Sequence, residues 1–320
     1  MGAWMRLFVT AGLLVIAGSH AAAQQPTFQS ATELVSMNVS VTGSHDQPVE
    51  GLTANQFAVF EDGVPQELKF FSPGELPLDV VILLDTSASM SESMPLVKQA
   101  AIKFARALRA GDRASVMGIS NGLRVLQEFT SDIASVEQAI DSATVAGRTP
   151  LYASIYTALK EVERYRRAAT EPRRQAIVVL SDGQDTASGF GFDELLDVIR
   201  RHAVPIYTIA PRPTKSTRLM REQIYGETTR VADFELRTLA TETGARSFFP
   251  VNVLELSGVY GQIATELAHQ YSLAYQSSNV TRDGGFHRIM VKITGPGLKW
   301  RTRAGYLAQR GSTASAGGDH

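Results

Sequence analysis

The feature that most constrains this chain is the segment 78–84, which is almost continuously apolar and rich in β-branched residues. A strand needs such a composition only when both of its faces are buried, as in a parallel sheet covered by helices. Helical patterns alternate along the chain with four further predicted strands, at 113–120, 123–129, 176–180 and 205–209. The sequence therefore predicts an α/β fold with a doubly wound, mostly parallel sheet and helices on both of its faces.

Oxygen-bearing side chains stand where ligands of such a sheet bind, beyond the carboxyl ends of the strands. Asp85, Ser87 and Ser89 directly follow the first predicted strand. Asp182 follows another strand, and Thr149 stands in a Thr-Pro loop before a predicted helix. The i, i+2, i+4 spacing of the first three residues lets one turning loop direct three hard oxygen ligands at a divalent ion. The sequence therefore predicts a metal site.

The three loops, in this order, resemble the metal-ion-dependent adhesion site of von Willebrand factor type A domains, and the resemblance covers roughly residues 76–270. In that family the first-loop Asp, the second-loop Thr and the third-loop Asp bind the ion directly or through water, and the two serines bind it directly. The resemblance implies that Mg²⁺ or Mn²⁺ is bound by Asp85, Ser87, Ser89, Thr149 and Asp182.

A donor set of this kind favours binding over catalysis. Two carboxylates and three hydroxyls leave one octahedral position to water, and a carboxylate from a partner protein can replace that water. The resemblance thus implies a metal-dependent protein-binding module, for adhesion or assembly, whose partner offers an Asp or Glu side chain, and no enzymatic activity. The alternative is a structural assembly protein whose metal only stabilises the loops.

Two enzymatic interpretations compete with this one. Residues 118–122 match the G-x-S-x-G nucleophile motif, with Ser120 as the candidate serine of a hydrolase. That motif requires a helix after the serine, whereas residues 123–129 alternate like a strand, so a hairpin turn is predicted instead. A phosphoryl-accepting Asp85 would need a second acidic residue two positions later, where the chain has Ser87. Helix capping or turn formation by the two aspartates would leave the spacing of the hydroxyls unexplained.

Charge, cysteine content and the N-terminus limit the function further. The 320 residues carry a formal net charge of −1 and no cysteine. The near-zero net charge argues against binding to nucleic acid or an anionic membrane. The absence of cysteine excludes disulfides and thiolate metal sites. Residues 1–23 have the positive, apolar and small-residue regions of a signal peptide. We therefore expect export to the periplasm or secretion, with no membrane span after cleavage; a retained N-terminal anchor is the alternative.

Short strand patterns flank the α/β region at both ends. The predicted strands are 34–41, 57–60, 66–71, 271–275, 286–293 and 300–306. We expect residues 30–75 and 271–309 to form the two parts of one β-sandwich, with the domain 76–270 inserted between them. Residues 211–232 are predicted to form a long loop, and residues 310–320 a disordered tail.

Two of the flanking segments also look similar to those of a bacterial subgroup described only as von Willebrand A-related. They are residues 57–63, which end in a predicted Glu-Asp-Gly hairpin turn, and residues 303–306. This similarity implies neither a substrate nor a pathway.

Overall fold

The computed structural model describes residues 34–211, 215–252, 255–279 and 284–308, with side chains described from residue 227 onward in the helix that begins at residue 215. The predicted signal peptide and the predicted tail lie outside these described residues. Among the helices that are described, none combines the length and the apolar character needed to cross a membrane.

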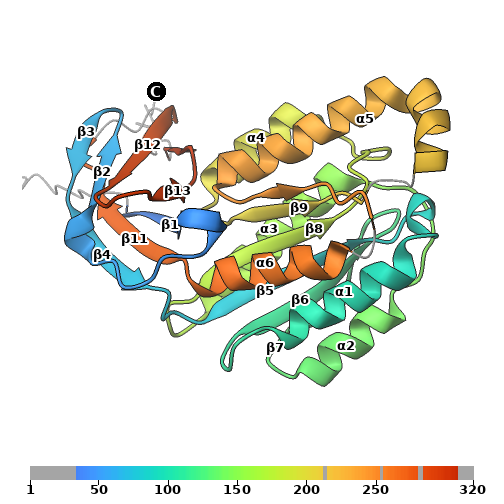
Figure 1. Cartoon of the computed structure of the whole chain (residues 1–320), viewed down its shortest axis with the longest axis horizontal. Coiled ribbons are helices and arrows are strands. Elements are labelled where there is room, and N and C mark those ends of the chain that lie inside the picture. The colour runs from blue at the N-terminus through green and yellow to red at the C-terminus, as the bar shows by residue number, and fades with distance from the viewer. Residues whose placement is uncertain (1–33, 212–214, 253–254, 280–283, 309–320) are drawn as a thin grey trace, which may run out of the picture. The chain divides into compact units, whose positions relative to one another are not determined.

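A six-stranded sheet forms the centre of the α/β region (Figure 1). Its strands are Leu78–Asp85 (β5), Arg113–Ile119 (β6), Leu123–Thr130 (β7), Arg174–Leu180 (β8), Ile206–Ile209 (β9) and Ser247–Phe248 (β10). Their order is β10-β9-β8-β5-β6-β7, and all neighbours are parallel except β6 and β7, which form an antiparallel hairpin. The predicted mostly parallel sheet is therefore confirmed.

Helices cover both faces of this sheet (Figure 1). They are Met94–Arg106 (α1), Ile133–Ser142 (α2), Leu151–Ala168 (α3), Phe192–Arg201 (α4), Lys215–Thr243 (α5) and Leu256–Ala268 (α6). Val80 and Ile82 of β5 pack in the cluster that contains α1, α2 and α6, whereas Val81 and Leu83 pack with α3, α4 and α5. Each buried side chain stabilises the fold by about 1.5–3 kcal/mol, which explains why the strand has no polar face.

The helix α5 corrects the prediction of a long loop over residues 211–232. Its second half has an apolar stripe, in which Ala232, Leu236 and Leu239 are buried against the sheet. Once the packed second half has formed a helix, the helix can extend toward its N-terminus. The segment there is rich in Arg and Glu, which are good helix formers, but it shows no apolar periodicity. The prediction failed because it relied on apolar periodicity alone.

Strands from both ends of the chain form two four-stranded sheets, in the orders β13-β1-β11-β4 and β14-β12-β2-β3. The first sheet contains Leu34–Thr42 (β1), Leu68–Pro73 (β4), Tyr271–Gln276 (β11) and Lys299–Arg301 (β13). The second contains Phe57–Glu61 (β2), Val64–Gln66 (β3), Phe286–Ile293 (β12) and Gly305–Leu307 (β14). Leu273 and Tyr275 of the first sheet and Val59 and Val291 of the second belong to one buried cluster.

Two predicted strands prove to be pairs of strands. Residues 66–71 divide between β3 and β4, and residues 300–306 divide between β13 and β14. In each pair the two strands belong to different sheets. A chain that passes from one sheet to another must interrupt its ladder of hydrogen bonds, and side-chain alternation does not report such a change of partner.

A buried carboxylate joins the six-stranded region to the first flanking sheet. Glu266 of α6 accepts hydrogen bonds from Ser40 Oγ on β1 at 2.9 Å and from the Tyr207 hydroxyl on β9 at 2.8 Å. Its other oxygen forms an ion pair with Arg301 of β13 at 2.6 Å. Burial of these groups is tolerated because each is paired, and the contacts fix the end of α6 against both sheets.

Candidate metal centre

The sheet register places the two predicted aspartate ligands at one edge. In the parallel ladder Leu84 of β5 lies opposite Leu180 of β8, so Asp85, the last residue of β5, and Asp182, two residues after β8, stand at the same edge of the sheet. Because strands in parallel ladders end together at one edge, residues far apart in the sequence meet there.

The first loop brings its own oxygen atoms together. Asp85 is fully buried, and its Oδ1 accepts the Ser87 backbone N–H at 2.9 Å. This bond turns the chain directly after the strand, and a 3₁₀ turn follows at Ala88–Met90. The hydroxyls of Ser87 and Ser89 lie 3.0 Å apart as a result. Three of the five predicted ligands thus come from one tightly turned segment.

The second loop is attached to the first through the backbone. Ala146 N–H donates to Thr86 O at 2.7 Å, and Ala88 N–H donates to Gly147 O at 3.3 Å. Gly147 has a φ of +79°, and a Cβ at this position would lie 2.5 Å from the Asn121 side chain, so only glycine fits. These contacts hold the segment just before Thr149 against the first loop, and Thr149 itself is 4% exposed.

The third loop is attached to the second in turn. Thr186 donates its backbone N–H to Thr149 O at 2.9 Å, and its hydroxyl accepts the Thr149 N–H at 3.0 Å. Asp182 is half-buried, and its Oδ1 accepts Gln184 N–H at 3.2 Å. Gly183, with a φ of +86°, packs so closely under Leu236 of α5 that a Cβ would lie 2.6 Å from Leu236 Cδ1. The three predicted loops therefore form one connected surface.

The electrostatics of this surface favour a bound cation. Burial raises the pKa of the Asp85 carboxyl to about 6, and the Asp182 carboxylate acts in the same direction, although hydrogen bonds from Ser181 and Ser87 oppose them. A divalent ion next to both carboxylates would remove this penalty. The donors are carboxylate and hydroxyl oxygens without nitrogen or sulfur, and such a set fits hard ions such as Mg²⁺ or Mn²⁺.

A comparison with protein families agrees with this geometry. The family model of the von Willebrand factor type A (VWA) domain matches residues 79–262, a range that contains all five predicted ligands. The chain belongs to the VWA family. No curated protein sequence matches this VWA protein.

Several solved structures are similar to this VWA protein. The von Willebrand factor type A protein from Catenulispora acidiphila is 10% identical, with a TM-score of 0.47, over 88% of this chain and 76% of that chain. Proximal thread matrix protein 1 from the mussel byssus is 14% identical, with a TM-score of 0.47, over 62% of this chain and 49% of that chain, so the match spans about half of that protein. The von Willebrand domain of a type V pili tip protein from Porphyromonas gingivalis is 15% identical, with a TM-score of 0.45, over 64% and 98% of the two chains.

Two residues at the VWA metal edge were not predicted to have these roles. Ser181 donates its hydroxyl to Asp85 Oδ2 at 2.6 Å and so connects the first and third loops. The sequence signal was available, because Ser181 is a hydroxyl residue directly before Asp182 at a strand end. Asp185 accepts Ser188 N–H at 3.1 Å, and it also accepts Tyr152 N–H at the start of α3 at 3.2 Å.

The alternative serine nucleophile lies in a hairpin, as the strand pattern predicted. Ser120 connects β6 to the antiparallel strand β7, so no helix follows it. Its hydroxyl donates to Ala146 O at 2.5 Å, which holds the hairpin against the second metal loop. A hydrolase would also need a base, and the candidates His202 and His269 make other contacts: His202 Nδ1 lies 2.8 Å from Val198 O, and His269 Nε2 lies 2.8 Å from Glu50. The arrangement lacks the strand-turn-helix geometry of a nucleophile elbow.

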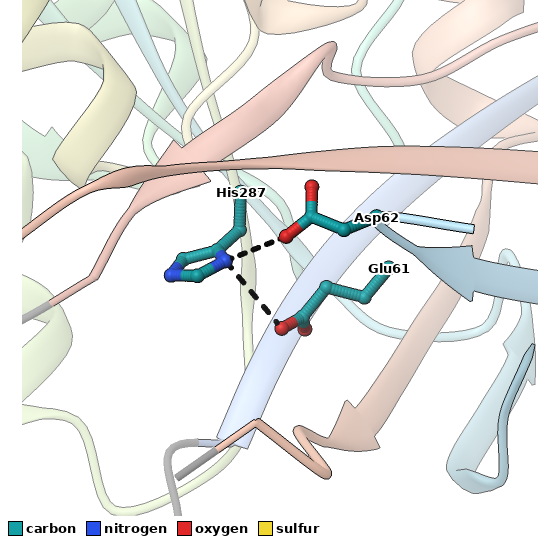
Figure 2. Close-up of side chains that lie close together, drawn as sticks. All are labelled: Glu61, Asp62 and His287. Carbon is teal, nitrogen blue, oxygen red and sulfur yellow. Dashed lines mark hydrogen bonds and ion pairs between the residues drawn. The ribbon is translucent and has the colours of Figure 1, made fainter. Parts of the chain in front are cut away.

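A second group of possible ligands lies on the flanking sheets, and no local sequence motif marks it. Glu61, Asp62 and His287 direct their side chains toward one another (Figure 2). His287 Nδ1 lies 2.8 Å from Asp62 Oδ2 and 3.9 Å from Glu61 Oε1. Asp62 and His287 are 225 positions apart, and only the pairing of β2 with β12 brings them together.

Proposed function

We propose that this VWA protein is an exported protein-binding module whose metal centre captures an acidic side chain of a partner. Proteins of the VWA family often mediate metal-dependent adhesion between proteins. The ion would be Mg²⁺ or Mn²⁺, held by Asp85, Ser87, Ser89, Thr149 and Asp182. It would supply one coordination position at which an Asp or Glu carboxylate replaces water. Such a site performs recognition and no catalysis.

The observation that carries this proposal is the assembly of the three loops around a buried, unneutralised carboxylate. Backbone bonds from Ala146 to Thr86, at 2.7 Å, and from Thr186 to Thr149, at 2.9 Å, join the three loops through the main chain. Loops that the main chain joins do not depend on metal ligation alone for their arrangement. This feature favours the adhesion role over the alternative in which the metal only stabilises the loops.

We also propose the bounds of the VWA domain, the role of the flanking strands and a route of export. The domain would span residues 76–270, and residues 30–75 and 271–309 would form a β-sandwich that carries it. The single buried cluster shared by the two flanking sheets supports this arrangement. Residues 1–23 would direct export to the periplasm or the exterior as a signal peptide.

The metal centre can be tested by titrating Mg²⁺ and Mn²⁺ into EDTA-treated protein lacking residues 1–23, by calorimetry and thermal melting. We expect saturable binding near one ion per chain. Asp85→Ala should abolish it, whereas Asp141→Ala, which removes an exposed carboxyl from α2, should not. Folded wild-type protein that binds neither ion would contradict the proposal.

Capture of an acidic side chain needs a separate test. Peptides selected from an unbiased library on the Mg²⁺-loaded protein should contain an Asp or Glu that is essential for binding. Replacing that residue with Asn or Gln, or adding EDTA, should abolish binding. Peptides that bind the Asp85→Ala variant equally well would support the structural alternative, in which the ion does not touch the partner.

A further inference from the structure

The cluster of Glu61, Asp62 and His287 lies at the end of β2 and on the paired strand β12 (Figure 2). Glu61 is the last residue of β2, Asp62 begins the hairpin turn, and His287 is on the antiparallel neighbour. One nitrogen and two carboxylate oxygens from these residues lie within 4.8 Å of one another. The three elements therefore direct three metal-binding atoms at one point.

The charge of this cluster is incompletely balanced. Glu61 is 2% exposed, and the hydrogen bonds that it accepts from described residues come from neutral groups: the hydroxyls of Tyr275 at 2.7 Å, Ser277 at 2.8 Å and Tyr306 at 3.2 Å. Within the described part of the chain, its one ion-pair contact is His287 Nδ1, at 3.9 Å. The same nitrogen is already hydrogen-bonded to Asp62. Two carboxylates thus share one imidazole nitrogen, and a buried carboxylate normally has a closer cation.

Other contacts fix the direction of each side chain. Arg288 N–H donates to Asp62 Oδ1 at 2.8 Å, which leaves Oδ2 directed at the imidazole. The His287 ring packs on the Tyr306 ring, with 5.4 Å between the ring centroids. The side-chain amide of Asn279 also lies 3.3 Å from His287 Nδ1. Metal ligands are oriented by outer contacts of this kind, which hold the donor atoms before the ion arrives.

We propose that Glu61, Asp62 and His287 form a second metal site, which binds a transition-metal ion such as Zn²⁺ and is independent of the VWA centre. An imidazole nitrogen with carboxylate oxygens is a ligand set that Zn²⁺ prefers and Mg²⁺ does not. Around a tetrahedral Zn²⁺ ion, ligand atoms lie roughly 3.3 Å apart. The two distances from His287 Nδ1, 2.8 and 3.9 Å, lie on either side of this value, and all three donor atoms lie within 4.8 Å of one another, so side-chain shifts on the order of 1 Å would complete the site.

The ion would replace a proton. In the metal-free protein the hydrogen bond between His287 Nδ1 and Asp62 Oδ2 contains one proton. On binding, that proton is released to solvent, and the nitrogen lone pair and both carboxylates coordinate the ion. Three protein ligands leave a fourth position for water, and Asp62, whose side chain is 46% exposed, opens the site to solvent. The redox state of the metal does not change.

The position of the site indicates a structural role. Glu61 and His287 belong to the second flanking sheet, whereas Tyr275, which donates to Glu61, belongs to β11 of the first. An ion bound here would add a link between β2 and β12 and would fix the carboxylate that joins the two sheets. We therefore expect Zn²⁺ to raise the melting temperature of the protein.

The test uses the full mature chain with Asp85→Ala, because that substitution removes the VWA centre as a competing Zn²⁺ site. In excess Mg²⁺, calorimetric titration with Zn²⁺ should show one ion per chain. Adding His287→Gln should weaken this binding at least tenfold. Adding His269→Gln is the matched control, since His269 also pairs with a carboxylate, Glu50, at 2.8 Å, and it should have no effect.

A second variant and a spectroscopic measurement keep the test decisive. If His287→Gln fails to fold, Asp62→Asn in the exposed turn replaces it, with the same expected loss of affinity. X-ray absorption of the Zn²⁺-loaded Asp85→Ala protein should show nitrogen and oxygen ligands that include an imidazole. The proposal would be overturned if this protein bound no Zn²⁺, or if Zn²⁺ binding survived both substitutions. Neither result would affect the VWA centre, which is tested with Mg²⁺ on the wild-type background.

Discussion

The metal edge of the VWA domain and the cluster on the flanking sheets bring carboxylates together in different ways. At the VWA edge, Asp85 and Asp182 come from turning loops at the ends of parallel strands, and the surrounding donors are hydroxyls and backbone N–H groups. In the cluster, Glu61 and Asp62 face an imidazole, that of His287, on an antiparallel strand. The first arrangement suits a hard ion and the second a transition metal.

The pKa values of the carboxyls show what this difference means for the metal-free protein. Burial raises the pKa of Asp85 to about 6, because its hydrogen bonds do not compensate for lost hydration and for Asp182 nearby. Burial also raises the pKa of Asp62, but the hydrogen bonds from His287 and Arg288 N–H outweigh it, and the pKa lies below its ordinary value. In the cluster, hydrogen-bond donors therefore stabilise the Asp62 carboxylate without an ion, whereas at the VWA edge the buried Asp85 carboxyl itself tends to keep its proton.

The largest expected effect is that substitutions at the two sites impair the binding of different metals. Asp85→Ala should reduce Mg²⁺ binding below detection and leave Zn²⁺ binding at the cluster intact, while His287→Gln should weaken Zn²⁺ binding at the cluster at least tenfold and leave Mg²⁺ binding intact. The reason is that the two ligand sets share no residue. Competition calorimetry with both ions on both variants measures this. Loss of both metals in either single variant, with the fold intact by circular dichroism, would show that the sites are not independent.

The free energy of unfolding of the metal-free protein should depend on pH, because burial raises the pKa of Asp85. Because the pKa of Asp85 in the folded state, about 6, lies above the unfolded value of 3.8, the folded protein holds a proton that the unfolded chain releases. The free energy of unfolding should therefore fall as pH rises from about 4 to about 6, by about 3 kcal/mol from this group. Mg²⁺ needs the ionised carboxylate, so its affinity should fall as pH drops below about 6.

Urea unfolding in EDTA measures this effect. Asp85→Asn cannot ionise, so it should be more stable than the wild type near pH 7.5 and comparable to it near pH 4.5. Parallel stability profiles of the two proteins across this range would contradict the assignment of the shift to Asp85.

A smaller effect is expected at Ser181, which orients Asp85 from the third loop at 2.6 Å. Ser181→Ala should weaken Mg²⁺ binding roughly tenfold, because outer contacts of metal ligands typically change affinity by 10–100-fold. Ser188→Ala is the control, since that hydroxyl donates to Asp185 at 2.6 Å instead. Calorimetry that shows equal affinities for the two variants would exclude an orienting role for Ser181.

The smallest effect should come from Ser277, one of three hydroxyls that orient Glu61. Ser277→Ala should weaken Zn²⁺ binding several-fold, because two other hydroxyls still orient Glu61, and it should leave Mg²⁺ binding unchanged. Ser278→Ala, whose hydroxyl accepts from Gln66 rather than donating to Glu61, is the matched control. An effect of Ser277→Ala on Mg²⁺ affinity would indicate that the flanking sheets and the VWA edge are coupled.

Sequence patterns were informative where structure is local. The strand β5, the hairpin of β6 and β7, and the turn after Asp85 depend on neighbouring residues and were predicted correctly. The N-terminal part of α5 was not, because its polar segment is helical in the context of a buried second half. The changes of sheet between β3 and β4 and between β13 and β14 were missed for a similar reason, since alternation does not identify the partner strand.

By itself the sequence determined the strand that must be buried on both faces, and the oxygen-bearing side chains that follow it, because apolar runs and i, i+2, i+4 spacing act over a few residues. Only the tertiary structure decided that Ser181 supports Asp85 and that Glu61, Asp62 and His287 meet. Those contacts depend on sheet register between segments distant in sequence. Register is set by the packing of whole sheets, which no short segment encodes.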